Sequence, residues 1–215
     1  MTNAIETVGL ARRFGRLDAV NGLNLEVPQG STFALIGPNG AGKTTTLKVL
    51  VNLLKPTAGT AMVLGTDSRR IGPTTLQRIG YISENQRLPD WMTPTELFAY
   101  CRPLYPTWDD ALCRRLQTDL RLVSNAPLRQ LSRGTRMKVA LLASLAYAPE
   151  LVVLDEPFSG LDPLARDELA QAIFLRNPSS REAVYGEYPY RGEEFSPSIL
   201  WPVPVVTEGR PSGSV

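Results

Sequence analysis

Residues 37–45 constrain the fold of this chain more than any other stretch, because they read G-P-N-G-A-G-K-T-T. An apolar run precedes them at 33–36, and good helix formers follow at 47–51. Glycines let successive backbone N–H groups turn toward one anion, and the start of the next helix adds its own free N–H groups. The order of strand, glycine-rich loop and helix therefore predicts a phosphate-binding loop in an α/β fold, with a nucleoside triphosphate as its ligand.

Two side chains of this loop have expected roles of their own. Lys43 can reach the β- and γ-phosphates, and the Thr44 hydroxyl can bind Mg²⁺. A plain glycine turn before a helix is the alternative, but the strand before and the helix after match the context that the motif requires. The candidate nucleotide-binding residues of the loop are Gly37, Asn39, Gly40, Ala41, Gly42, Lys43, Thr44 and Thr45.

Two acidic residues follow a second apolar run. Residues 151–154 read L-V-V-L, which is typical of a strand buried on both faces of a parallel sheet, and Asp155 and Glu156 come next. Alone, such a pair is more often a solvated strand end. Together with the phosphate loop, Asp155 is expected to hold Mg²⁺, and Glu156 to orient the attacking water or accept its proton. The sequence thus predicts both halves of an ATPase site.

The rest of the chain indicates one core with an insertion. From 93 to 148 the periodicity is helical, and Thr93, Pro94 and Glu96 form an N-cap, a first-turn proline and a capping box. Three consecutive helices predict a helical subdomain at about 92–148, inserted in an ATP-binding domain at 1–175. Further strands are expected at 5–14, 23–27, 61–65 and 79–82.

Composition excludes several classes of protein. The net charge of +2 gives no electrostatic argument for nucleic acid as a partner. The longest apolar run, 139–148, is too short to span a bilayer, and the first residues do not form a secretory signal. Cys101 and Cys113 have neither metal-binding spacing nor a disulfide framework, so they are expected to be idle thiols in a reducing cytoplasm.

Two further motifs carry a family resemblance. Residues 131–135 read L-S-R-G-T, and residues 154–163 read L-D-E-P-F-S-G-L-D-P. With the phosphate loop and the loop after Tyr81, they resemble the ATP-binding subunit of a bacterial ABC transporter from about residue 5 to residue 173. The resemblance implies a phosphate-loop NTPase core, that is, a mixed and largely parallel sheet with an antiparallel β subdomain, plus the helical subdomain.

The resemblance also implies roles for residues outside the phosphate loop. Phe14 would stack on adenine, although a core phenylalanine is the alternative. Ser132 and Gly134 would contact the γ-phosphate bound to a second subunit, and Asp162 would connect the two sites. The partners implied are a membrane permease and a head-to-tail partner, either a second copy or a paralogous subunit. ATP and Mg²⁺ would be bound, and the location would be cytoplasmic, on the inner face of the membrane.

Three positions depart from the family pattern. Glu84 stands where the family usually has glutamine, and Gln86 follows two residues later. We expect Glu84, rather than Gln86, to face the γ-phosphate and the metal, as a catalytic residue and a metal ligand. Thr135 replaces a common glutamine. The histidine that touches the γ-phosphate in the family is missing, because this sequence contains no histidine.

Five aromatic residues near the start of the helical subdomain have two interpretations. The family places the docking site of the permease here, and an aromatic surface fits such a site. Core packing is the equally weighted alternative. The five residues are Trp91, Phe98, Tyr100, Tyr105 and Trp108.

The last residues, 176–215, are atypical. Residues 178–215 hold six prolines and four glycines and show no periodicity, so a disordered tail is expected. No apolar run at 179–187 suits a central strand, so the C-terminal strands of the family are expected to be missing and the edge beside 151–154 to be open. A shifted reading frame after about 173 would explain the change, and a divergent natural tail is the alternative.

The leading hypothesis is an ATP-binding and ATP-hydrolysing subunit that powers transport, as an exporter, through a separate permease. One alternative is a truncated or frameshifted remnant that binds nucleotide without hydrolysing it. The other is a soluble ABC ATPase that acts on DNA or ribosomes, for which long coiled coils or tandem cassettes would be expected. Neither feature occurs in this sequence.

Overall fold

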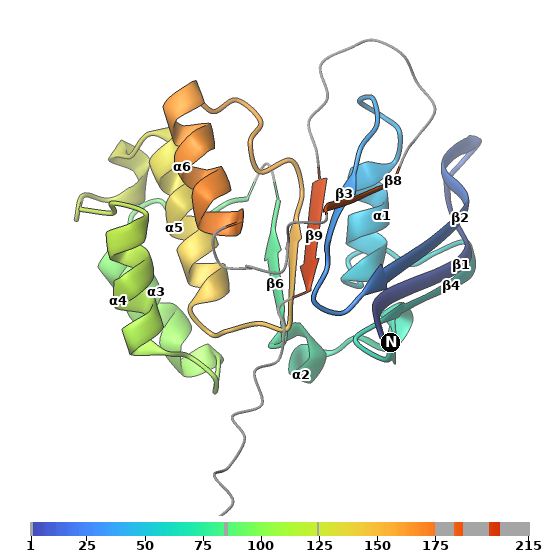
Figure 1. The fold of residues 1–215 in the computed structure, drawn as a ribbon, viewed down its shortest axis with the longest axis horizontal. Helices are drawn as coiled ribbons and strands as arrows, with labels where there is room; N and C mark the ends of the chain where they lie inside the picture. The colour runs from blue at the N-terminus through green and yellow to red at the C-terminus, as the bar shows by residue number, and fades with distance from the viewer. Residues whose placement is uncertain (1, 84–85, 124, 175–182, 187–197, 203–215) are drawn as a thin grey trace, which may run out of the picture.

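The computed structural model describes residues 2–83, 86–123, 125–174, 183–186 and 198–202, with side chains up to residue 170 (Figure 1). It contains two sheets with helices between and beside them. The strands of the first sheet are β1 (Asn3–Phe14), β2 (Leu17–Pro28), β4 (Ala58–Val63) and β5 (Thr66–Asp67), in the antiparallel order β2-β1-β4-β5. The strands of the second are β3 (Thr32–Leu35), β6 (Ile79–Ile82), β7 (Leu151–Leu154), β8 (Ala183–Gly186) and β9 (Ser198–Pro202), in the order β6-β7-β9-β3-β8.

The second sheet is mostly parallel and is covered on both faces. β6 runs parallel to β7, and β3 runs parallel to β8, whereas β9 is antiparallel to both of its neighbours. Helix α1 (Lys43–Leu50) lies on the face toward the first sheet (Figure 1). The other face carries α3 (Pro94–Cys101), α4 (Asp110–Asp119), α5 (Arg133–Leu145) and α6 (Pro163–Phe174). The short helices are η1 (Ser68–Arg70), α2 (Pro73–Leu76), η2 (Arg102–Leu104) and η3 (Leu128–Gln130).

Strand β7 connects the two hydrophobic cores, because its side chains alternate between them. Leu151 and Val153 pack with α1 and the first sheet, and Val152 and Leu154 pack with α3 to α6. All four are fully buried, which confirms the prediction of a strand buried on both faces. The prediction of a mixed, largely parallel core with an antiparallel β sheet is also confirmed.

The residues expected to cap helices do so in the structure. The Thr93 side chain accepts a hydrogen bond from Glu96 N, and Glu96 Oε2 accepts one from Thr93 N at 2.8 Å, so the expected capping box forms at α3. Ser132 caps α5 by accepting a hydrogen bond from Thr135 N at 3.1 Å. Every element between β6 and β7 is helical in the described part of the chain. The exact limits 92–148, 1–175 and 176–215 stay predictions.

The prediction of an open edge beside β7 was wrong. Strand β9 pairs along all of β7, from Leu151 opposite Pro202 to Leu154 opposite Ile199. The prediction considered only a parallel strand, which needs a long crossover, whereas β9 runs antiparallel. The segment 183–186 does form a strand, β8, but at the sheet edge rather than in its centre. No parallel strand lies directly beside β7 on that side in the described residues.

Two expectations from composition can be compared with the structure. Cys101 and Cys113 are both free thiols, as expected. Within the described residues, no helix is both long and apolar enough to cross a membrane.

Candidate functional site

The phosphate loop joins β3 to α1 and depends on glycine at its last position. Gly42 lies in the left-handed region, with φ of 92°, and it is the residue that precedes α1. A Cβ added to Gly42 would lie 2.1 Å from the carbonyl oxygen of Ala19 on β2. Backbone strain and lack of space therefore both exclude other residues here. The hairpin of β1 and β2 therefore lies directly against the loop.

Lys43 is buried inside the loop. Its Nζ donates hydrogen bonds to the carbonyl oxygens of Gly37 at 2.7 Å and Pro38 at 3.1 Å. It also lies 3.5 Å from Glu156 Oε1, and its side chain is only 3% exposed. A buried ammonium is costly without partners, and these three oxygens provide them. The loop thus holds one positive charge at a fixed place.

Thr44 connects the loop to the end of β7. Its Oγ1 donates a hydrogen bond of 2.8 Å to Asp155 Oδ1, across 111 positions of sequence. Asp155 is buried, and its backbone N donates to the carbonyl of Ile82 on β6 at 2.8 Å. The two motifs that the sequence singled out separately are therefore in direct contact.

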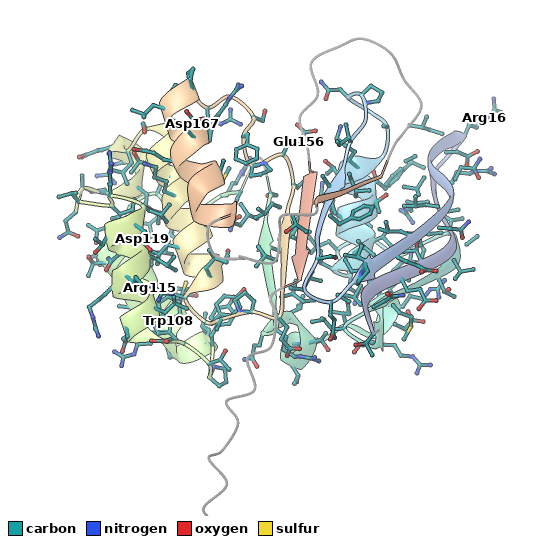
Figure 2. The ribbon with its side chains drawn as sticks, viewed as in Figure 1. Arg16, Trp108, Arg115, Asp119, Glu156 and Asp167 are labelled. Carbon is teal, nitrogen blue, oxygen red and sulfur yellow. The ribbon has the colours of Figure 1, made fainter. Side chains whose placement is uncertain are left out.

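Glu156 follows β7 in a strained conformation and lies at the end of the sheet (Figure 2). Its φ of 51° places a non-glycine residue in the left-handed region, at a cost of about 1–3 kcal/mol. The turn after it is closed by a hydrogen bond from Ser159 N to Glu156 O at 3.1 Å. Strain of this kind concentrates at functional sites. The turn directs the carboxylate toward Lys43, as their 3.5 Å separation shows.

The side chains at the contact between Thr44 and Asp155 suit a magnesium ion. Mg²⁺ prefers hard oxygen ligands, and it usually takes only one or two from the protein while keeping several waters and substrate phosphates. A hydroxyl and a carboxylate oxygen 2.8 Å apart provide such a pair. In the described residues no group of three or more His, Cys, Asp or Glu side chains could hold a metal by itself. The residues present therefore fit an ion shared with a triphosphate.

Phe14 lies at the end of β1, and its side chain is 41% exposed rather than buried in the core. The guanidinium carbon of Arg12 lies 4.5 Å from the centre of the Phe14 ring, so it covers one ring face. Arg12 is anchored by a hydrogen bond from its Nη1 to Lys55 O at 2.9 Å. Arg12 pairs with Val20 on β2, and the residue before Val20 is Ala19, whose carbonyl lies against Gly42. The exposed aromatic ring thus belongs to the hairpin that abuts the phosphate loop.

Ser132, Gly134 and Asp162 form a second group, at the N-terminal ends of α5 and α6. Asp162 Oδ1 accepts a hydrogen bond from Ala165 N at 3.0 Å. A Cβ added to Gly134 would lie 3.0 Å from Ala165 Cβ, so the two helix starts pack closely. These helices cover the face of the sheet opposite to α1 (Figure 1). The structure therefore brings the three residues together, on the other face of the sheet from the helix that begins at Lys43.

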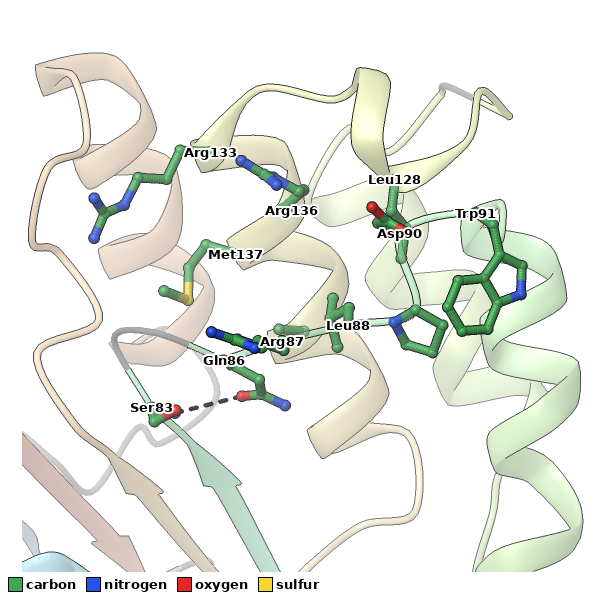
Figure 3. A pocket seen from close by; sticks show the side chains of 12 residues that line it. Ser83, Gln86, Arg87, Leu88, Asp90, Trp91, Leu128, Arg133, Arg136 and Met137 are labelled. Atoms are coloured by element: carbon green, nitrogen blue, oxygen red, sulfur yellow. Dashed lines mark hydrogen bonds between the residues drawn. The ribbon is translucent and has the colours of Figure 1, made fainter.

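The loop after β6 contains Glu84 and Gln86, and of these two the structure describes only Gln86. Glu84 lies outside the described residues, so its expected role stays a prediction. Gln86 is exposed, and its Oε1 accepts a hydrogen bond from Ser83 N at 3.4 Å (Figure 3). In this structure the Gln86 side chain lines a groove beside α5.

That groove has a volume of about 870 Å³ and lies between the loop after β6 and helix α5. Figure 3 shows its side chains, with Trp91 at one end and Arg133 at the other. Apolar side chains such as Met137 form part of its wall. Its charged lining residues are Arg87, Arg133, Arg136 and Asp90, so positive charge is in excess.

The five aromatic residues divide between the two interpretations. Phe98 is buried and Trp108 packs against the same core. Tyr105 stacks on Tyr147 with ring centres 3.9 Å apart. Tyr100 is 56% exposed, and Trp91 is 65% exposed and lines the groove. Packing thus accounts for three of them, and only Trp91 belongs to the groove.

Sequence reasoning missed three features of this region. One is Arg12 over the Phe14 ring, and another is the row of arginines in the groove. The third is Tyr81 on β6, whose hydroxyl is buried without a hydrogen-bond partner in the described residues. The spacing of Arg12 and Phe14 at i and i+2 on a strand was a usable signal, since both then lie on one face. The other two features depend on register and on distant segments.

Comparison with known proteins gives a consistent result. A family profile described as "ABC transporter" matches residues 20–159. An uncharacterised ABC transporter ATP-binding protein of Synechocystis is 38% identical over 166 residues, which are 74% of this chain and 46% of that protein. The daunorubicin/doxorubicin resistance ATP-binding protein DrrA of Streptomyces peucetius is 36% identical over 173 residues, which are 78% of this chain and 52% of DrrA.

A solved structure of an ATP-binding subunit of an ABC transporter superposes with a TM-score of 0.69 at 28% identity. The superposition covers 79% of this chain and 72% of the solved chain. By contrast, the chain spans about half the length of the two curated relatives described above.

Proposed function

We propose that this chain, which belongs to the ABC transporter family, is an ATP-binding subunit that powers transport through a separate membrane permease. The observation that carries the proposal is the direct contact between the phosphate loop and the acidic end of β7. Thr44 bonds to Asp155 at 2.8 Å, and Lys43 lies 3.5 Å from Glu156. A positive charge, a metal-binding pair and a carboxylate thus meet where a triphosphate would end.

Lys43 and Glu156 form an ion pair at this site, with Nζ 3.5 Å from Oε1. Each charge is largely buried, and each partly neutralises the other. A triphosphate brings several negative charges to the same place, so it competes with Glu156 for the ammonium. Binding of ATP then leaves Glu156 free to orient a water molecule. The backbone N–H groups of the loop and of the α1 start bind the phosphates.

Thr44 and Asp155 would hold a magnesium ion in this proposal. The ion, when bound, would neutralise charge on the phosphates. Glu84 stays a proposed further ligand and catalytic residue on the loop after β6. Ser132, Gly134 and Asp162 face a second subunit, since Ser132 and Asp162 cap helices away from the phosphate loop, Gly134 lies in the first turn of α5, and a serine cap with free N–H groups is an anion site. The subunit therefore acts as a head-to-tail dimer.

Phe14 is expected to contribute to binding of the base. Phe14→Ala should weaken ATP binding by about 0.5–1.5 kcal/mol, because one ring face is exposed while Arg12 supports the other. Tripolyphosphate, which has no base, should bind the variant and the wild type equally. Isothermal titration with both ligands measures the difference, and Leu17→Ala, an exposed change on the same hairpin, is the control. Equal loss for both ligands would refute adenine stacking.

The groove beside α5 is the proposed docking site of the permease. The groove lies between the loop after β6 and α5, the helix that Ser132 caps. A partner segment bound in the groove would therefore contact both that loop and α5. The apolar wall of the groove, with the excess of arginine, favours a partner segment that carries apolar and acidic side chains. Transport outward is the proposed direction, because DrrA is a daunorubicin/doxorubicin resistance protein.

Charge reversal in the groove provides a test of docking. Arg87→Glu combined with Arg136→Glu should reduce recovery of a co-expressed permease by about tenfold or more, because like charges then face each other. Arg115→Glu, on the outer face of α4 (Figure 2), makes the same change in charge per site outside the groove and should have no effect. Co-purification from membranes measures both. Unchanged recovery in the double variant would refute docking in this groove, and failure of the wild type to recover any permease would favour a soluble ATPase that has no permease.

A further inference from the structure

An arginine holds the Phe14 ring at the end of β1. The guanidinium carbon of Arg12 lies 4.5 Å from the centre of that ring, which is within the range of a cation–π contact. Arg12 and Phe14 are two positions apart on β1, and this contact shows that both side chains lie on the same face. Phe14 is nevertheless 41% exposed. The guanidinium therefore covers one face of the ring and leaves apolar surface open for a ligand.

Arg12 is anchored to the segment that joins α1 to β4. Its Nη1 donates a hydrogen bond to the carbonyl oxygen of Lys55 at 2.9 Å. Two further hydrogen bonds join this segment to β1. Thr57 N donates to Ala11 O at 2.7 Å, and Arg13 N donates to Thr57 Oγ1 at 3.0 Å. The guanidinium and the backbone on either side of it are thus held by the same short segment.

This segment is in turn attached to α1. The backbone N–H groups of Leu53 and Leu54 both donate to the carbonyl oxygen of Lys48, at 2.8 and 3.0 Å. The N-terminal end of the same helix follows the phosphate loop. A chain of hydrogen bonds therefore leads from α1, through Lys55, to the guanidinium over the ring.

The neighbouring arginine has a different partner. Arg13 Nη2 donates to Asp18 Oδ2 at 3.0 Å, and these two residues pair across the hairpin of β1 and β2. Both side chains are largely exposed, and exposed ion pairs contribute little to stability. Consecutive arginines of β1 thus differ in what they contact, since one lies over an aromatic ring and the other on a carboxylate.

We propose that Arg12 positions the Phe14 ring for the base of ATP, so that guanidinium, ring and adenine stack in three layers. A planar guanidinium can cover the ring and donate to Lys55 O at the same time. A ring already held in its binding orientation loses less conformational freedom when the base arrives, so it binds the base more tightly. Arg12 is a positioning residue, because it acts through Phe14. The proposal rests on the proposed function, in which Phe14 contacts the base.

A purely structural role of Arg12 predicts a different result. Ala19, on the same hairpin, lies directly against Gly42 of the phosphate loop. If Arg12 only kept the hairpin in place, its loss would disturb the phosphate loop as well. Arg12→Ala would then weaken binding of ATP and of tripolyphosphate by the same factor, since both ligands use that loop.

The experiment measures binding of Mg-ATP and of Mg-tripolyphosphate to the 215-residue chain by isothermal titration. In Arg12→Ala the preference for ATP over tripolyphosphate should fall about two- to fivefold, the size of a cation–π contact at an exposed site. Arg13→Ala removes the same charge at the next position and should keep the wild-type preference. In a Phe14→Ala background, Arg12→Ala should cause no further fall, because it acts through that ring.

Three outcomes would overturn the proposal. The first is an unchanged preference in Arg12→Ala while Phe14→Ala lowers it. The second is an equal fall in Arg13→Ala, which would mean that general order of the hairpin is what matters. The third is a further fall when Arg12→Ala is added to Phe14→Ala, which would mean that Arg12 contacts the nucleotide itself. If Phe14→Ala left the preference unchanged, adenine stacking on Phe14 would fail, and this proposal would fail with it.

Discussion

Replacing Lys43 with alanine is expected to weaken binding of Mg-ATP by about 1.5–3 kcal/mol, the loss of one charge-assisted hydrogen bond. Lys43 is the only cationic residue in the loop 37–45, and three oxygens fix its Nζ there, from Gly37, Pro38 and Glu156. Since 1.4 kcal/mol corresponds to a factor of ten, the dissociation constant should rise by roughly ten- to more than a hundredfold. Isothermal titration or a fluorescent nucleotide measures the change.

The matched control for this prediction is Lys48→Ala. It removes the same charge from the same helix, α1, one turn and more beyond the loop. Affinity should be unaltered in the control. Melting temperatures of both variants without nucleotide show whether the loss of the Glu156 partner unfolds the site. Equal ATP affinity in wild type and Lys43→Ala would remove the assignment of the phosphate loop.

Hydrolysis by the 215-residue chain is expected to be very slow, even though ATP binds. The sequence has no histidine to touch the γ-phosphate, and loss of one preorganised donor typically lowers the rate by about 10²–10³-fold. The strand beside β7 runs antiparallel, so its first residue, Ser198, lies level with Leu35 at the site edge, where a parallel strand would present its carboxyl end.

Release of phosphate under saturating Mg-ATP tests this prediction. Glu156→Gln, which keeps the size of the side chain but removes the carboxylate, shows how much of any turnover belongs to this site. Robust turnover that disappears in Lys43→Ala would contradict the prediction. Such a result would exclude the hypothesis of a non-hydrolysing remnant.

The parts of the fold that the sequence predicted correctly depend on short stretches of chain. The glycines of 37–45 favour one backbone path, as Gly42 shows, and L-V-V-L at 151–154 is typical of a strand buried on both faces. The contact of Thr44 with Asp155 then follows, because strand carboxyl ends meet at one edge of a parallel sheet. Local rules thus suffice for the centre of the site.

The features that the sequence did not reveal are those that depend on pairing between distant segments. Strand β9 is five residues long, and proline stands at its last position, which argues against a central strand. The walls of the groove come from the loop after β6 and from α5, which are far apart in the sequence. The excess of positive charge in the groove could therefore not be predicted from the sequence.

The place of β9 in the sheet also sets the order in which this molecule can be completed during synthesis. Strands β3 and β7 carry the two halves of the site, and β9 is inserted between them although it comes last in the chain. Chains leave the ribosome from their N-terminus, and contacts between distant segments form late. The phosphate loop and Asp155 would therefore both have left the ribosome before β9, the strand between β3 and β7, has been synthesised. Translation stopped before residue 198 would release a chain that has every candidate residue of its site but lacks the strand that joins β3 to β7.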